Sequence, residues 1–163
     1  MNQGPGTTGN VDGLVVTRRL WASLTAAGAL IAFVVSLLDG RWGGSSGVAV
    51  GISVGLLSIA AAMFCRRRKL DVSSEEALAE SYRTLFFLSF ALVEAPYLAA
   101  FVLTFVVDER IVVIAALPFY LLGMFMIAPL SGEMRRRQQQ ITAQGSALSL
   151  EDALRKMPTG VAR

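Results

Sequence analysis

Four long apolar blocks dominate the pattern of the chain. They cover residues 20–38, 46–65, 84–107 and 111–130, and a charged side chain lies inside the third block alone. An α-helix rises about 1.5 Å per residue, so about 20 residues cross the ~30 Å hydrocarbon core of a bilayer. We therefore predict that each block is a membrane-spanning helix. The predicted fold class is all-α, an integral membrane four-helix bundle.

Polar segments separate the blocks. Residues 39–44 combine Asp, Arg and Trp with three glycines, which is typical of a turn. Residues 108–110 join the last two blocks so tightly that these helices must be antiparallel neighbours. The connection over residues 66–83 is longer. Inside it, Ser73 and Glu76 have the spacing of a capping box, so the third helix is predicted to begin one residue after Ser73 and to run to the end of its block.

The two ends of the chain are polar. Residues 1–19 are predicted to be a disordered N-terminal segment, because the first part is rich in Gly, Thr and Asn. Residues 132–163 are predicted to form a cytoplasmic tail. In this tail, Leu150, Leu154 and Met157 recur at the spacing of one helix face, which predicts a short amphipathic helix. That helix either lies in solvent or docks on a partner or on the membrane surface.

The basic residues predict the orientation. If the N-terminus is cytoplasmic, all of the 15 basic residues except Arg41 and Arg110 fall on the cytoplasmic side, as the positive-inside rule requires. Both termini are therefore predicted to be cytoplasmic, in a multi-pass protein of the cell or inner membrane. The first block is long, and no small-residue cleavage site follows it, so we treat it as a span rather than a signal peptide. The predicted cytoplasmic set is Arg18, Arg19, Arg66, Arg67, Arg68, Lys69, Arg83, Arg135, Arg136, Arg137, Arg155, Lys156 and Arg163.

The composition agrees with a membrane protein and excludes several chemistries. Hydrophobic residues make up 54% of the chain and charged residues 17%, against roughly 45–50% and about 25% in an average soluble domain. The chain has no histidine and one cysteine, which excludes a His-based triad, a His or Cys metal site and an internal disulfide. The net charge of +3 follows from the topology, so no nucleic-acid partner is predicted. We also expect no enzymatic activity, no cofactor and no metal.

Glu94 is the charged residue that lies inside a block. It is roughly 15 Å along the helix from Thr84 and roughly 20 Å from Val107, near the predicted bilayer midplane. A charge there costs about 2.5–3.5 kcal/mol on insertion scales, and no basic residue lies inside any block to pair with it. A carboxyl that is neutral in lipid and ionised when it meets water or a cation can carry a proton. Glu94 is therefore the candidate proton- or ion-binding residue, and the alternative is a structural acid hydrogen-bonded to a neighbouring helix.

Two prolines fall inside the third and fourth blocks. Pro96 and Pro118 lack a backbone N–H, so the carbonyls of Leu92 and Ile114 lose their helical donors and each helix is predicted to kink. A protonated Glu94 or a water could use the carbonyl of Leu92. The two prolines either mark one shared broken layer or are ordinary tolerated transmembrane prolines.

Glycines recur every four residues at the start of the second block, at Gly43, Gly47, Gly51 and Gly55. Small residues at this spacing let helix backbones approach closely. Gly47, Gly51 and Gly55 are therefore the candidate helix-packing residues. They serve either a homo-oligomer such as a ring or close packing within one chain.

Basic runs end the second block and follow the fourth. Residues 66–69 and 135–137 are predicted to be topology signals, with contact with anionic lipid headgroups as a second use. Cys65, next to the first run, is predicted to be a buried small apolar residue, and acylation at the membrane edge is the alternative.

The third block resembles the second helix of the F-type ATP synthase proteolipid, subunit c. In that family an Arg-Thr-Leu run enters the outer helix, and the ion-carrying carboxylate follows eleven residues later in an Ala-Leu-x-Glu-Ala context. Arg83 and Glu94 have the same separation and setting. The resemblance covers about residues 43–107, including a Gly-rich preceding span and a basic joining loop. It implies that Glu94 is the proton site and that the glycine face is packed.

These features lead to two functional hypotheses. The first is a proteolipid-like, proton- or ion-binding subunit of a larger membrane assembly, with Glu94 as the reversible carrier. The second is an accessory or scaffold membrane protein without transport activity, in which Glu94 is a buried packing acid. The predicted partners are the lipid bilayer and either other membrane subunits or further copies of this chain.

Overall fold

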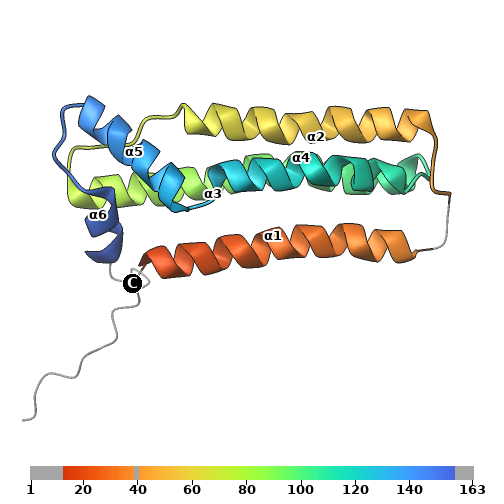
Figure 1. Ribbon diagram of the computed structural model, residues 1–163, viewed down its shortest axis with the longest axis horizontal. Coiled ribbons are helices and arrows are strands. Elements are labelled where there is room, and N and C mark those ends of the chain that lie inside the picture. The colour runs from red at the N-terminus through yellow and green to blue at the C-terminus, as the bar shows by residue number, and fades with distance from the viewer. Residues whose placement is uncertain (1–12, 39–40, 157–163) are drawn as a thin grey trace, which may run out of the picture.

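The computed structural model describes residues 13–38 and 41–156, and within these ranges its regular structure is helical throughout (Figure 1). The predicted all-α fold class is therefore confirmed. Two short helices follow the four long ones. The helices are α1 (Gly13–Leu37), α2 (Ser45–Arg66), α3 (Glu75–Val106), α4 (Ile111–Ile127), α5 (Ser131–Ala143) and α6 (Leu150–Lys156).

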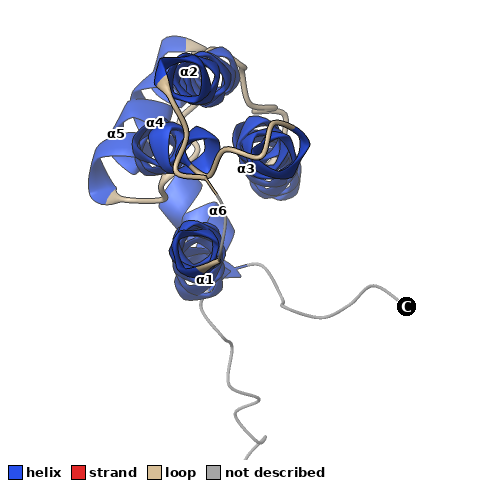
Figure 2. Ribbon diagram, turned by 90° about the vertical axis from the view of Figure 1, so that its right-hand side faces the viewer, coloured by secondary structure: helices blue, strands red, loops and turns tan. Residues whose placement is uncertain are grey.

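The four long helices lie side by side, and α4 contacts each of the other three (Figure 1, Figure 2). Viewed along the helices in Figure 2, α2, α3 and α4 are grouped together and α1 stands at the edge of the group. The main apolar core lies around α4. Its buried members from this helix are Val112, Val113, Ala116, Tyr120, Met124 and Ile127.

Three helices, α1, α2 and α3, are each long and apolar enough to cross a membrane. The fourth predicted span runs to Leu130, whereas α4 ends at Ile127 and has 17 residues. It reaches spanning length only together with α5, to which it is bent by 51°. Pro129 explains the early end, because proline disfavours the helical conformation in the residue before it. Accordingly, Ala128 has a ψ of 135°.

The start of α1 differs from the prediction. Residues 13–19 are helical rather than disordered, because α1 begins at Gly13. Leu14 in this first turn is buried in an apolar cluster with residues of α3 and α6, so a tertiary contact holds a segment that composition alone left unstructured. The rest of the predicted disordered segment, residues 1–12, lies outside the described residues.

The start of α3 is capped by Ser74 rather than Ser73. The Ser74 hydroxyl accepts a hydrogen bond from the backbone N–H of Ala77 at 3.1 Å, while the N–H of Ser73 donates to the Asp71 carboxylate at 2.9 Å. The predicted capping box pairs Ser73 with Glu76. With the cap one residue later, the third position after it is an alanine, which has no carboxylate to complete the box.

One face of α2 consists of small residues and packs against α4. A Cβ added at Gly51 would overlap the carbonyl of Val112, and one at Gly55 would lie 2.9 Å from the Cβ of Phe119. Gly43 lies in the preceding turn with a φ of 101°. The glycine face is therefore used for packing within one chain. The buried positions of α2 are Gly47, Gly51, Gly55, Ser58, Ala62 and Cys65.

A second apolar cluster lies at the end of the molecule that carries α5 and α6 (Figure 1). Leu150 and Leu154 of α6 are buried there with Leu14 of α1 and Leu78 of α3. The predicted amphipathic helix therefore forms and docks on the rest of the chain. Met157, the third member of the predicted face, lies outside the described residues.

At the opposite end, the two short connections bond to each other. The backbone N–H groups of Arg110 and Ile111 donate to the carbonyls of Arg41 at 3.2 Å and Trp42 at 3.0 Å. The Arg110 guanidinium also lies over the Trp42 ring, 5.7 Å from its centroid. The first N–H groups of a helix have no partner inside it, so the turn before α2 satisfies the start of α4.

Candidate functional site

Glu94 lies in the middle of the apolar part of α3, and its side chain is half-buried. Its carboxyl is hydrogen-bonded to the hydroxyl of Tyr120 in α4. The second carboxyl oxygen, Oε2, is buried and has no hydrogen-bond partner in the part of the chain that the structure describes. The acid thus has one interhelical contact and one unmatched oxygen.

A pair of stacked tyrosines links this carboxyl to α1. The rings of Tyr97 and Tyr120 have centroids 4.3 Å apart and an interplanar angle of 16°. The Tyr97 hydroxyl donates to the carbonyl of Gly28 at 2.9 Å, and the Tyr120 hydroxyl to that of Leu24 at 3.5 Å. A Cβ at Gly28 would lie 2.5 Å from the Tyr120 hydroxyl oxygen. The missing side chain of Gly28 therefore allows the tyrosine to approach the α1 backbone.

The Tyr120 hydroxyl has one hydrogen, so its two acceptors compete for it. An ionised Glu94 is the stronger acceptor, because charge-assisted hydrogen bonds are stronger than neutral ones. A protonated Glu94 can instead donate to the Tyr120 oxygen, and the tyrosine hydrogen can then turn to the Leu24 carbonyl. The protonation state of Glu94 can therefore decide whether Tyr120 bonds to α3 alone or bridges α3 and α1.

Pro96 and Pro118 lie inside α3 and α4, and both helices continue through them. Each proline lies within two residues of one of the stacked tyrosines, so the two proline segments meet at the same depth. The hydroxyl of Ser58 in α2 donates to the carbonyl of Val93 at 2.9 Å. This carbonyl is next to that of Leu92, which loses its helical donor to Pro96. A neighbouring helix therefore supports the backbone of α3 in the proline layer.

A second polar cluster joins the C-terminal end of α2 to α5. Glu133 forms ion pairs with Arg66 at 3.2 Å, Arg136 at 3.4 Å and Arg137 at 3.0 Å. The Arg137 side chain is only 5% exposed. Two members of the basic run at residues 135–137 are thus structural groups as well as candidate topology signals.

Arg136 and Arg137 also cap the C-terminal end of α2. Arg137 donates to the carbonyls of Cys65 at 3.2 Å and Arg68 at 2.9 Å, and Arg136 donates to that of Arg66 at 3.0 Å. The last carbonyls of a helix have no intrahelical donor, and its dipole favours cations there. Burial lowers the pKa of the Arg137 guanidinium, and the adjacent carboxylate of α5 opposes that shift. The group stays charged at any physiological pH.

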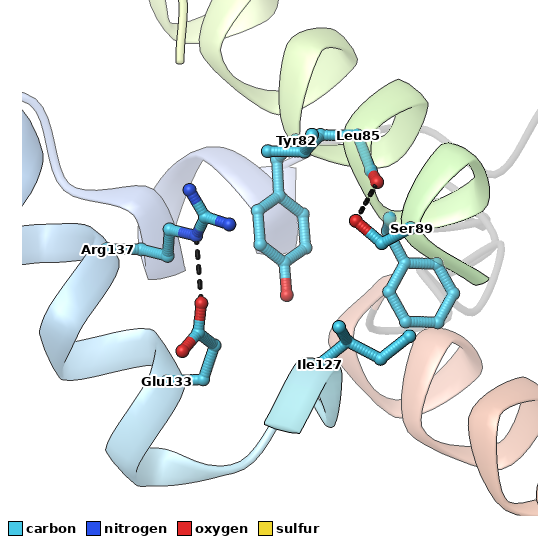
Figure 3. A pocket seen from close by; sticks show the side chains of 7 residues that line it. Tyr82, Leu85, Ser89, Ile127, Glu133 and Arg137 are labelled. Atoms are coloured by element: carbon cyan, nitrogen blue, oxygen red, sulfur yellow. Dashed lines mark hydrogen bonds and ion pairs between the residues drawn. The ribbon is translucent and has the colours of Figure 1, made fainter. Parts of the chain in front are cut away.

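A small cavity lies beside this cluster (Figure 3). Its volume is about 20 Å³, which is room for about one water molecule. In Figure 3 the Tyr82 ring stands between the Arg137–Glu133 pair and Ser89, whose hydroxyl donates to the Leu85 carbonyl at 2.6 Å. Polar groups therefore extend from the Arg137–Glu133 pair of α5 to Ser89, which lies about 7.5 Å along α3 from Glu94.

The sequence predicted Glu94 but not its partners. Tyr97 and Tyr120 both lie deep in apolar blocks, where a phenol hydroxyl needs a hydrogen-bond partner, so their positions carried a signal. Glu133 lies two residues before the first of three consecutive arginines, which also indicated an ion-pair cluster. Gly28 is one small residue among several in its block, and nothing in the pattern distinguishes it.

The lone thiol lies in the packed interface. Cys65 is fully buried, as the prediction of a small packed residue requires, and burial leaves no thiol surface for acylation. Within residues 13–38 and 41–156, no three His, Cys, Asp or Glu side chains gather in the manner of a metal site.

No protein-family model, curated protein or solved structure matches this chain.

Proposed function

We propose that the protein is a multi-pass membrane subunit that binds and releases a proton at Glu94. The four long helices would form a bundle across the cell or inner membrane. Three of them have spanning length on their own, and the 17-residue α4, which packs among them, would be the fourth span. Both termini would be cytoplasmic, because the basic runs at residues 66–69 and 135–137 share one end of the helices.

The observation that carries this proposal is the half-matched carboxyl of Glu94. A buried acid that serves packing alone gains most when both oxygens have partners, because each unmatched polar atom in an apolar setting costs about 1–3 kcal/mol. Glu94 interacts with Tyr120, and its Oε2 has no hydrogen-bond partner among the described residues. The neutral form reduces that cost, and the ionised form recovers the Tyr120 hydrogen. The site can therefore accommodate Glu94 in either protonation state.

The resemblance to the ATP synthase proteolipid supports Glu94 as the proton site, but it does not extend to a ring packed through glycines. The face of Gly47, Gly51 and Gly55 is buried against α4, so a second copy could reach it only by displacing that helix. Lipid and any further subunits would contact the outer faces of the helices instead. Large apolar side chains are exposed there, such as Phe33 of α1 and Leu57 of α2.

Reaction with a hydrophobic carbodiimide tests the proposal, because the reagent enters lipid and modifies protonated carboxyl groups. We expect one modified acid, Glu94, and a rate that falls as the pH rises through its titration. Glu94→Gln should abolish the reaction. The matched control is Glu80→Gln, which changes an exposed acid on the same helix and should leave the rate unchanged. A reaction at Glu94 that does not depend on pH, or no reaction in the folded protein, would contradict proton exchange.

The accessory or scaffold function remains the second candidate, and the hydrogen bond between Glu94 and Tyr120 favours it. Under that hypothesis the acid serves to join α3 to α4. Glu94→Gln and Glu94→Ala separate the two functions. Proton binding predicts that Glu94→Gln inserts and unfolds like the wild type, because an amide occupies the same volume as the neutral acid. A packing acid predicts that both variants lose stability to a similar extent and are degraded in cells.

A further inference from the structure

A cavity of about 500 Å³ lies between the start of α1, α5 and the start of α6. Its volume falls in the range of small-molecule sites, about 300–1,000 Å³. Arg18, Arg135 and Gln138 contribute polar groups to its lining, and Leu14 and Met134 contribute apolar surface. The cavity is thus an amphipathic pocket, and it is separate from the polar clusters around Glu94 and Glu133.

The charge of the lining favours an anion. Arg18 and Arg135 have no carboxylate partner in the described part of the chain. The Nε of Arg18 donates to the carbonyl of Pro129 at 3.1 Å, which orients the guanidinium and leaves its terminal nitrogens for a ligand. The acid in the lining, Glu151, is bonded to Arg155 at 2.6 Å. Two guanidinium groups in one pocket suit a phosphate group, which they can bind with paired N–H donors.

Arg135 differs in this respect from the two arginines that follow it. Arg136 and Arg137 are bound to Glu133 and to the last carbonyls of α2. Arg135 is exposed and lies on the side of α5 that faces α1 and α6. A topology signal requires only positive charge, and it does not explain why this arginine and Arg18 line the same cavity.

The depth of the cavity indicates which phosphate it would hold. The backbone partner of Arg18 lies in the break after α4, and α1 becomes continuously apolar from Leu20 onward. In an inserted chain this level is the interface between lipid headgroups and hydrocarbon. On the membrane side of Arg18, α1 exposes large apolar side chains, among them Leu30 and Phe33. An apolar face of this kind can contact acyl chains, which a soluble phosphate does not have.

We propose that this cavity binds the phosphate headgroup of an anionic phospholipid of the cytoplasmic leaflet, through Arg18 and Arg135. The proposal requires membrane insertion and does not depend on proton binding at Glu94.

Quenching of Trp21 by brominated lipid tests the site. The chain has two tryptophans, and Trp21 lies one helical turn from Arg18, so Trp42→Phe leaves one reporter close to the cavity. The protein is placed in phosphatidylcholine vesicles that contain a rising share of brominated phosphatidylglycerol. We expect a binding preference for the anionic lipid that Arg18→Gln with Arg135→Gln lowers by about tenfold or more, because the variant loses the charge-assisted hydrogen bonds from two guanidinium groups to the phosphate.

Two controls keep the result specific. Arg19→Gln with Arg67→Gln removes the same charge from exposed positions outside the cavity and should leave the preference within about twofold of the parent, since surface charges are screened. Ser131→Phe fills the cavity without changing its charge and should also lower the preference. An equal loss in the Arg19 and Arg67 variant would show diffuse surface attraction and overturn the proposal.

A soluble ligand is distinguished by competition. Inorganic phosphate or glycerol phosphate at millimolar concentration should not displace the brominated lipid, because neither has acyl chains to contact α1. Displacement by either compound, or normal quenching in Ser131→Phe, would also refute a lipid headgroup site in this cavity.

Discussion

Replacement of Arg137 by Met is expected to weaken the joint between α2 and α5. The variant keeps much of the side-chain volume and removes four donor contacts, to Glu133 at 3.0 Å, the Arg68 carbonyl at 2.9 Å, Gln140 at 3.1 Å and the Cys65 carbonyl at 3.2 Å. Removing one partner of a buried ion pair costs about 3–5 kcal/mol when the other charge is left alone.

Here the remaining carboxylate is not left alone, because Arg66 and Arg136 still pair with Glu133. We therefore expect a loss of about 2–3 kcal/mol in the free energy of unfolding, below the full penalty for an unpaired buried charge. Arg136→Met is the matched control. Its side chain is 35% exposed, so solvent screening limits the expected loss to about 1 kcal/mol or less.

The assay is reversible unfolding in mixed detergent micelles, followed by the helical circular dichroism signal. A double-mutant cycle with Glu133→Gln isolates the pair, because the double variant should lose less than the sum of the two single variants. Equal losses for Arg137→Met and Arg136→Met, or a strictly additive cycle, would refute the argument that the buried guanidinium joins α5 to α2.

Three further predictions concern other parts of the molecule. Gly51→Leu should lose about 1–3 kcal/mol of stability through overpacking against α4, and the native mass of the protein should stay the same. The control Ser53→Leu, on the exposed face of α2, should change neither quantity. A lower native mass for Gly51→Leu would show that the glycine face joins separate chains. Ser58→Ala removes the hydroxyl bonded to an α3 carbonyl and should cost about 1 kcal/mol in unfolding free energy, against a negligible loss for Ser53→Ala, and equal losses would contradict this role. The backbone N–H of Ser73 donates to the Asp71 carboxylate and lowers the pKa of that carboxyl from the ordinary 3.8. The small stabilising effect of this bond is complete above pH 3.8 and is lost as the pH falls through the lowered pKa. An NMR titration midpoint for Asp71 at or above 3.8 would contradict the bond.

The positions of the four long helices could be predicted because they follow from local apolar content, and their ends could not because tertiary contacts decide them. The block at residues 46–65 became α2 with one residue added at each end. The first turn of α1 depends on the burial of Leu14 against distant helices. α5 was missed altogether, although its Glu, Met, Arg and Gln residues favour a helix. Arg137 holds α5 against the end of α2, and a pattern of apolar residues cannot predict that a charged side chain is buried.

The candidate site shows the same division between local and distant information. The position of Glu94 near the middle of a span follows from counting residues along one helix. Its partner Tyr120 lies in another block, and only the packing of α3 against α4 sets the two at the same depth. The glycine repeat predicted a close helix contact, yet the repeat itself carries no information on whether that contact lies within a chain or between chains.

The two polar clusters differ in a way that bears on their roles. Glu133 has three arginine partners, and those arginines have further bonds to the end of α2, so the loss of any one contact leaves most of the cluster in place. Such redundancy suits a structural joint. Glu94 has one hydroxyl partner, and that hydroxyl has a second acceptor in α1. A group that must change protonation in an apolar setting benefits from a contact that can be exchanged at little cost, because a rigid network would bind one state too tightly to release it. The sparse bonding of Glu94 is therefore the physical reason to expect that this acid exchanges a proton.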